Sequence, residues 1–243
     1  MSVKNDSLVK YSLVIPVYNE QDNLPALRDN ILSAMKTIIG SFEVIFVDDG
    51  STDKSRQIIK QICVEDPRFH LIFFDRNYGQ TSAFDAGFKM ATGDIIITMD
   101  ADLQVDACDA KLLLDELGEH DAAVGYRKKR ADTLVKRISS RVGNAVRNKV
   151  INENIRDVGC PLKAIKREAL LRIKLYEGMH RFFPALLSLE GYSVTEVPIN
   201  HYPRQRGKSK YTIRNRLFKS FKDLLAVRWM KKRYMHYRII ERG

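Results

Sequence analysis

The sequence is poor in the features that mark secreted, membrane-spanning and disulfide-rich proteins. Its 243 residues include three cysteines, and an odd number of cysteines without metal-ligand spacing argues against a disulfide framework or a zinc site. The longest stretch without a charged residue is 11–19, far short of the roughly 18 apolar residues of a membrane span. The first ten residues are polar and lack the apolar segment of a signal peptide. These absences favour a protein of the reducing cytoplasm.

Two nucleotide-binding motifs are also missing. No Gly-x-Gly-x-x-Gly sequence occurs, which disfavours a dinucleotide-dependent oxidoreductase. Gly207-Lys208-Ser209 matches the end of a P-loop, but Tyr202 stands where that loop requires its first glycine, so a P-loop NTPase is disfavoured. The five histidines are scattered and form no recognisable His–carboxylate dyad, and we expect them to be structural or at the surface rather than catalytic.

The net charge of +11 is concentrated in two basic segments. Residues 200–243 contain fourteen Lys and Arg and two acidic residues, and residues 127–150 contain nine Lys and Arg and one acidic residue. The remainder of the chain is therefore acidic. This asymmetry indicates an anionic partner, such as nucleic acid, a phosphate-bearing ligand or an anionic membrane. A solvated basic face without any partner would have the same composition.

Residues 11–130 alternate short apolar runs with stretches of helical periodicity. This rhythm predicts βαβ units and therefore an α/β fold with a mostly parallel sheet flanked by helices. Asp53 is the expected N-cap of the second helix. We expect strands at 12–17, 43–47, 70–74, 95–99 and 122–126, and helices at 22–39, 53–64, 80–90 and 109–117.

The rhythm changes after residue 130. We expect a basic helix at 133–150, a strand at 158–165 with a helix following from 166, a helix at 182–190, a strand at 194–199, and a basic loop at 201–210. Residues 212–230 predict an amphipathic helix, because apolar residues recur on one face: Ile213, Leu217, Phe218, Phe221, Leu224 and Leu225. The expected organisation is one catalytic domain at 1–211 and a basic helical tail at 212–243.

The most informative motif is Asp100-Ala101-Asp102, which directly follows the apolar strand expected at 95–99. Two carboxylates separated by one residue can converge beyond the C-terminal edge of the sheet, where open α/β sheets bind their ligands. Oxygen ligands of this kind suit Mg²⁺ or Mn²⁺, and such an ion usually completes its shell with phosphate. The alternative is that one of these acids simply caps the next helix.

Two other strands end in polar residues. Asp48-Asp49 follows the strand at 43–47, and Tyr18-Asn19-Glu20 follows the strand at 12–17. If these strands are neighbours, their ends line one crevice in which aromatic, amide and carboxylate groups can hold a base and a ribose. Each piece also has a local explanation, in packing or in turn formation.

Six segments together resemble a known family. Residues 14–20, 47–51 and 100–104 resemble family-2 glycosyltransferases with the GT-A fold, and residues 77–80, 157–160 and 204–211 narrow the resemblance to the polyprenyl-phosphate type. That type includes the dolichol-phosphate mannose synthases and, in closer resemblance, the bacterial undecaprenyl-phosphate 4-deoxy-4-formamido-arabinose transferases. The resemblance spans roughly residues 11–225. It implies transfer of one sugar from a nucleotide-sugar, UDP favoured over GDP, to a polyprenyl phosphate, with inversion.

The resemblance also implies roles for individual residues. Those expected to contact the donor nucleotide are Pro16, Tyr18, Glu20, Asp48, Asp49 and Ala101. Those expected to gather Mg²⁺ or Mn²⁺ and the donor diphosphate are Asp100, Asp102 and Gln104. Those expected to face the phosphates and close over donor and acceptor are Arg127, Arg181, Arg204 and Ser209. Asp157 matches an acid near the reacting centre, and its alternative role is to orient Arg127.

This chemistry agrees with the residue types. A phosphate monoester has a second pKa near 6, so the acceptor is ionised at neutral pH and needs no strong general base. It needs arginines, which bind phosphate in a bidentate way.

The chain departs from many of these relatives because no transmembrane segment follows the catalytic region. The basic tail, with Trp229 and Tyr234 beside Lys231-Lys232-Arg233, suits an interfacial anchor on the inner face of the cell membrane. The tail can instead pack on its own sheet, in a homo-oligomer or on a partner protein.

Two rival functions stay open from the sequence. One is a family-2 transferase acting on another acceptor, although Leu225 replaces the Gln of the Gln-x-x-Arg-Trp motif found in processive synthases. The other is a non-enzymatic protein that binds nucleic acid or membrane, although the basic residues form no recognisable nucleic-acid module.

Overall fold

The protein is built on one seven-stranded sheet. The computed structural model describes residues 10–128, 145, 147–151, 155–203, 213–235, 240 and 241, and for 213–220 the backbone alone. The strands are β1 (Tyr11–Val17), β2 (Phe42–Asp48), β3 (Phe69–Phe73), β4 (Ile95–Thr98), β5 (Ala122–Arg127), β6 (Lys163–Lys166) and β7 (Val194–Ile199). Their order is β3-β2-β1-β4-β6-β5-β7. Of these, β6 runs antiparallel to both its neighbours and the other strands are parallel, so the predicted mostly parallel α/β sheet is confirmed.

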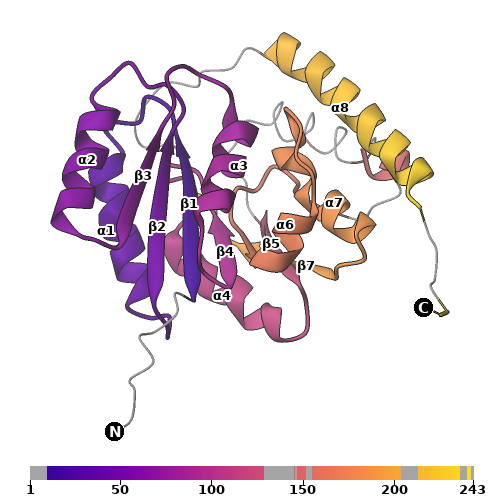
Figure 1. Cartoon of the computed structure of the whole chain (residues 1–243), viewed down its shortest axis with the longest axis horizontal. Coiled ribbons are helices and arrows are strands. Elements are labelled where there is room, and N and C mark those ends of the chain that lie inside the picture. The colour runs from indigo at the N-terminus through magenta and orange to yellow at the C-terminus, as the bar shows by residue number, and fades with distance from the viewer. Residues whose placement is uncertain are drawn as a thin grey trace, which may run out of the picture.

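Helices cover both faces of this sheet (Figure 1). The α-helices are α1 (Leu24–Met35), α2 (Ser55–Glu65), α3 (Gln80–Met90), α4 (Ala110–Asp115), α6 (Arg167–Arg172), α7 (Phe183–Leu189) and α8 (Ile213–Arg233), and the short 3₁₀ turns are η1 (Ala107–Asp109), η2 (Glu116–Gly118) and η3 (Met179–Phe182). One core cluster joins the sheet to α1, α2 and α4, and a second joins it to α3, α6, α7 and α8. Because β1 and β2 contribute alternate residues to the two clusters, their sequences are apolar almost throughout.

Several predicted boundaries were wrong, each for a local reason. Helix α2 begins at Ser55, because the Asp53 carboxylate accepts the amides of Ser55 (2.9 Å) and Gln21 (3.3 Å) and so bridges two loops. The helix expected at 109–117 is the short α4 between two 3₁₀ turns. The strand expected at 158–165 starts at Lys163, because the Cys160 amide donates to the Asp157 carbonyl in a turn (3.1 Å).

The C-terminal helix α8 packs on α7, at the end of the molecule away from α1 and α2 (Figure 1). Leu224 and Val227 are its buried anchors, whereas Phe221, Leu225 and Trp229 are exposed. The predicted apolar face is therefore wrong in part, since it contains two exposed residues and omits Val227. Within the described residues, no helix combines the length and the apolar character needed to cross a membrane. Most of the basic helix expected at 133–150 and of the loop expected at 201–210 lies outside the described residues.

Candidate active site

The acidic loop after β4 is held in a defined shape. Leu103 has a left-handed backbone (φ 58°), and the Gln104 amide donates to Asp102 Oδ1 (3.2 Å). Further along, Asn30 of α1 donates to Asp106 Oδ1 (2.9 Å) and accepts the Ala107 amide (2.9 Å). The loop that carries Asp100 and Asp102 is therefore fastened to the sheet at one end and to α1 at the other.

The two carboxylates of this loop repel each other in a poorly solvated place. Burial and the charge of Asp102 raise the pKa of Asp100 to about 6, against the opposing effect of Lys163, Arg127 and a hydrogen bond from Gln80. That bond runs from Gln80 Nε2, in the first turn of α3, to Asp100 Oδ1 (2.7 Å). A divalent cation would relieve the repulsion, so the donor set fits Mg²⁺ or Mn²⁺. Among the described residues, no group of three or more His, Cys, Asp or Glu is arranged to hold a metal ion, so phosphate or water would supply the ion's remaining ligands.

The ends of β1 and β2 are tied together beside this loop. The register pairs Val17 with Asp48, which brings Tyr18 next to the end of β2. Asn19 has a left-handed backbone (φ 53°), and its Oδ1 accepts the Thr52 amide (2.7 Å) while its own amide donates to Ser51 Oγ (2.8 Å). The half-buried Pro16, Tyr18 and Glu20 therefore sit on a rigid segment.

Both carboxylate oxygens of Asp49 bind the backbone just before helix α3. Its two oxygens accept the amides of Tyr78 (2.6 Å) and Gly79 (2.9 Å). The following Gly50 has φ +76°, and a Cβ there would lie 2.3 Å from the carbonyl carbon of Arg76, so only glycine fits. These contacts fix the start of α3 and thereby place Gln80 beside Asp100. A direct contact of Asp49 with nucleotide stays a prediction.

Asp48 is bound differently from its neighbour. Its side chain is completely buried, and Oδ1 accepts the Ser51 amide (3.0 Å) and Arg56 Nε (2.8 Å). Its Oδ2 has no hydrogen-bond partner within the described part of the chain. A buried carboxylate oxygen without a partner is costly, and a ligand that donates a hydrogen bond would remove that cost.

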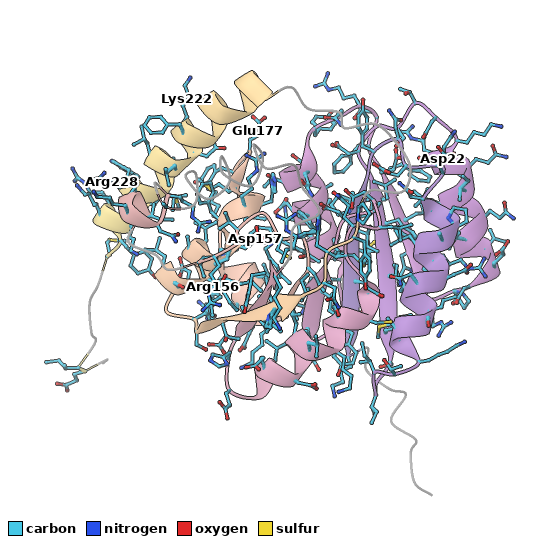
Figure 2. All side chains as sticks on the ribbon, turned by 180° about the vertical axis from the view of Figure 1, so that it is seen from behind. Asp22, Arg156, Asp157, Glu177, Lys222 and Arg228 are labelled. Carbon is cyan, nitrogen blue, oxygen red and sulfur yellow. The ribbon has the colours of Figure 1, made fainter. Side chains whose placement is uncertain are left out.

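A cationic group faces the acidic loop from β5 and β6. Arg127 Nε donates to Asp157 Oδ2 (2.6 Å) and its Nη2 donates to Asp157 Oδ1 (2.9 Å). Both side chains are largely buried, and Figure 2 labels Asp157 near the middle of the view. Lys163, also buried, is paired with Thr98 across β4 and β6, and its Nζ donates to the Cys160 carbonyl. This geometry favours the second of the two roles considered for Asp157, which is to orient Arg127.

The turn η3, which contains Arg181, follows a segment bound to the first turn of α3. Thr81, next to Gln80 in α3, accepts the Gly178 amide (3.0 Å), and its hydroxyl lies 2.7 Å from His180 Nδ1. The segment before Arg181 is thereby fastened to the helix that contacts Asp100.

The structure thus gathers most of the predicted site residues at one edge of the sheet. Ala101 is buried in the core at the acidic loop, and Gln104 contacts Asp102 through its backbone amide. Arg204 and Ser209 lie outside the described residues. Sequence reasoning missed Gln80, Lys163 and Arg56 as members of the site. A lysine within the apolar run 161–165 was the one available signal for Lys163.

Comparison with known proteins identifies the class. A family model described as Glycosyl transferase family 2 matches residues 12–173. The chain is 37% identical over 225 residues to the undecaprenyl-phosphate 4-deoxy-4-formamido-L-arabinose transferase of Yersinia pestis, a match that covers 91% of this chain and 68% of that protein. The chain therefore belongs to glycosyltransferase family 2, and it is a glycosyltransferase.

Solved structures agree with the fold. Glucosyl-3-phosphoglycerate synthase from Mycobacterium tuberculosis, in complex with Mn²⁺, UDP-glucose and phosphoglyceric acid, superposes with a TM-score of 0.66 at 17% identity and covers 92% of this chain and 79% of its own. A mannosyltransferase from Pyrobaculum calidifontis, in complex with GDP-Man and Mn²⁺, gives a TM-score of 0.64 at 19% identity and covers 96% and 67%. These likenesses establish the GT-A fold.

Proposed function

We propose that the protein transfers a single sugar from a nucleotide-sugar, with UDP favoured over GDP, to a polyprenyl phosphate, in a reaction that needs Mg²⁺ or Mn²⁺ and inverts the anomeric carbon. The observation that carries this proposal is the meeting of an acidic loop and a cationic group at one sheet edge. Asp100 and Asp102 suit a cation with a diphosphate, and Arg127 suits a second phosphate. The named activity of the Yersinia relatives supports the same assignment.

The donor side is prepared before the substrate arrives. A bound divalent ion would stabilise the negative charge that develops on the departing diphosphate. The protein's own contribution is to hold the two carboxylates in place, through Gln80 on Asp100 and the Gln104 amide on Asp102. Tyr18 and Asp48, at the neighbouring strand ends, would contact the base.

The acceptor side needs orientation rather than a base. A phosphate monoester is ionised at neutral pH, so its oxygen can attack without losing a proton. Asp157 binds two of the five N–H donors of Arg127 and fixes the plane of its guanidinium. We assign Arg127 to the acceptor phosphate and Asp157 to positioning Arg127, with Arg181, Arg204 and Ser209 as further phosphate contacts.

Peripheral contact with the inner face of the membrane is the second part of the proposal. Phe221, Leu225 and Trp229 recur every fourth residue on the exposed side of α8. Lys222 and Arg228 also project from α8 (Figure 2). An aromatic and basic helix surface of this kind suits an anionic bilayer, where a polyprenyl phosphate would be found.

A transfer assay tests both parts. Purified protein is incubated with a panel of UDP- and GDP-sugars, Mn²⁺ or Mg²⁺, and undecaprenyl phosphate in anionic vesicles, and the glycolipid is measured. We expect one donor to give product and chelation by EDTA to stop it. Product from glycerol 3-phosphate but none from undecaprenyl phosphate would contradict the proposed acceptor. Full turnover in EDTA would contradict the proposed need for a divalent metal.

Vesicle binding tests α8 separately. Trp229 is the chain's single tryptophan, so its fluorescence emission should shift to the blue on anionic vesicles. The triple variant Phe221→Ser, Leu225→Ser, Trp229→Ser should sediment with vesicles at least about tenfold less. Undiminished sedimentation of that variant would contradict the membrane assignment.

A further inference from the structure

The two oxygens of Asp48 are in unequal states. Oδ1 is saturated, because it accepts both the Ser51 amide (3.0 Å) and Arg56 Nε (2.8 Å). Oδ2 is buried and has no hydrogen-bond partner among the described residues. Because Asp48 ends β2 beside the β1 segment that carries Tyr18, the residue lies at the strand edge assigned above to the donor base.

Arg56 holds this arrangement from three directions. In addition to its bond to Asp48, its Nη2 donates to the Phe74 carbonyl, and its guanidinium lies 5.6 Å from the centre of the Phe73 ring. The Asp48 carbonyl in turn accepts the Phe74 amide (2.9 Å). A guanidinium held at three points cannot swing away from Oδ1 without losing its contacts with Phe73 and Phe74.

We propose that Arg56 determines the choice of donor base, by occupying Oδ1 of Asp48 and leaving Oδ2 as a single acceptor. Uracil presents one ring N–H, at N3, and needs one carboxylate oxygen. Guanine presents N1–H and the N2 amino group side by side, a pair that calls for both oxygens of a carboxylate. With Oδ1 occupied, the site matches uracil. This inference rests on the proposed use of a nucleotide-sugar and deepens it.

The competing explanation is that Arg56 only braces the fold. Lys60 offers a matched control, because it lies on the same helix and its Nζ is also 5.6 Å from the centre of the Phe73 ring. Lys60→Met removes a cation from Phe73 without disturbing Asp48. A purely structural role predicts similar behaviour for Arg56→Met and Lys60→Met, whereas a role in base choice separates them.

The first measurement uses the unaltered protein. Dissociation constants of UDP, N3-methyl-UDP and GDP are measured by titration calorimetry with Mn²⁺. We expect N3-methyl-UDP to bind at least about 100-fold more weakly than UDP, because the methyl group removes the donor and leaves Oδ2 unpaired. GDP should bind at least about tenfold more weakly than UDP. Equal binding of N3-methyl-UDP and UDP, or a preference for GDP, would overturn the inference while leaving nucleotide-sugar transfer intact.

The second measurement uses the variants. In Arg56→Met, the GDP-to-UDP ratio of dissociation constants should fall about tenfold, since both oxygens of Asp48 become available, and in Lys60→Met it should stay at the wild-type value. Arg56→Leu, a second apolar replacement that serves if the Met variant does not fold, should lower the ratio in the same direction. A wild-type ratio in each Arg56 variant that folds would overturn the inference alone. Failure of the wild-type protein to bind any nucleotide would overturn the proposed function as well.

Discussion

The donor side and the acceptor side of the site are built by different interactions. On the donor side, amides hold Asp49 (from Tyr78 and Gly79) and Asp100 (from Gln80), and Asp48 with Arg56 is the one ion pair described there. On the acceptor side, the contacts join full charges, as in the bidentate pair of Arg127 and Asp157. In the proposed function, the donor side would bind a cation through acids, and the acceptor side would bind an anion through arginine.

This difference predicts how substitutions on each side affect activity and stability. Backbone donors remain when a side chain is changed, so substitutions in the acidic loop of Asp100 and Asp102 should remove chemistry and spare the fold, whereas the buried pair of Asp48 and Arg56 is an exception. A buried ion pair leaves an uncompensated charge when one partner is removed, which typically costs about 3–5 kcal/mol of stability. Substitutions on the acceptor side should therefore lower both activity and stability.

The largest effect is expected from Asp102→Asn. It keeps the shape of the loop but removes a cation ligand, and the transfer rate should fall about 1000-fold with the melting temperature nearly unchanged. Asp106→Asn is the matched control, because the amide oxygen can still accept the Cys108 amide. Normal turnover in the Asp102 variant would contradict the metal assignment and remove the proposed contrast between the two sides.

A double-mutant cycle on Arg127 and Asp157 sharpens the acceptor side. Arg127→Ala and Asp157→Asn should each lower kcat/KM about 100-fold, and the double variant should lose little more, because Asp157 acts through Arg127. Each single variant should also unfold at lower urea than the wild type. Additive losses in kcat/KM would instead place Asp157 in direct contact with a substrate.

A smaller effect is expected from Gln80→Ala. The loss of its bond to Asp100 should raise the KM of the donor about tenfold. The KM of the acceptor should stay unchanged, because Gln80 belongs to the donor side. Ser82→Ala, in the same helical turn, removes a bond to the Tyr78 carbonyl and serves as the control. An effect of Gln80→Ala confined to the acceptor KM would break the division into two sides.

The smallest effect is expected from Asp121, which braces the acceptor side far from the chemistry. A hydrogen bond from Lys166, helped by Ser193, lowers the pKa of Asp121 to about 2. Its stabilising contribution is therefore present above about pH 4 and is lost as the pH falls toward 2. Asp121→Asn should cost about 1 kcal/mol at pH 7 after solvent screening, less at pH 2.5, and leave turnover unchanged. Equal urea stability of the variant and the wild type at pH 7 would contradict this.

Sequence patterns predicted the βαβ rhythm well, because buried parallel strands are apolar almost throughout and helices show their own period. They also placed Asp100 and Asp102 just after a strand of the sheet, because a strand that runs into acids is a local signal, and the role of these acids as cation ligands stays a prediction. They did not separate the tasks of Asp48 and Asp49, since these depend on Arg56 and on the amides of Tyr78 and Gly79. Nor did they predict the exposed and buried sides of α8, because which face packs is decided by α7.

The most direct test of the account is the position of the ion. A crystal of the protein soaked with UDP and Mn²⁺ is measured at the manganese absorption edge. The account predicts an anomalous peak at bonding distance, about 2.0–2.5 Å, from a carboxylate oxygen of Asp102 and in contact with the diphosphate. A peak elsewhere, or bound UDP without any peak, would contradict it.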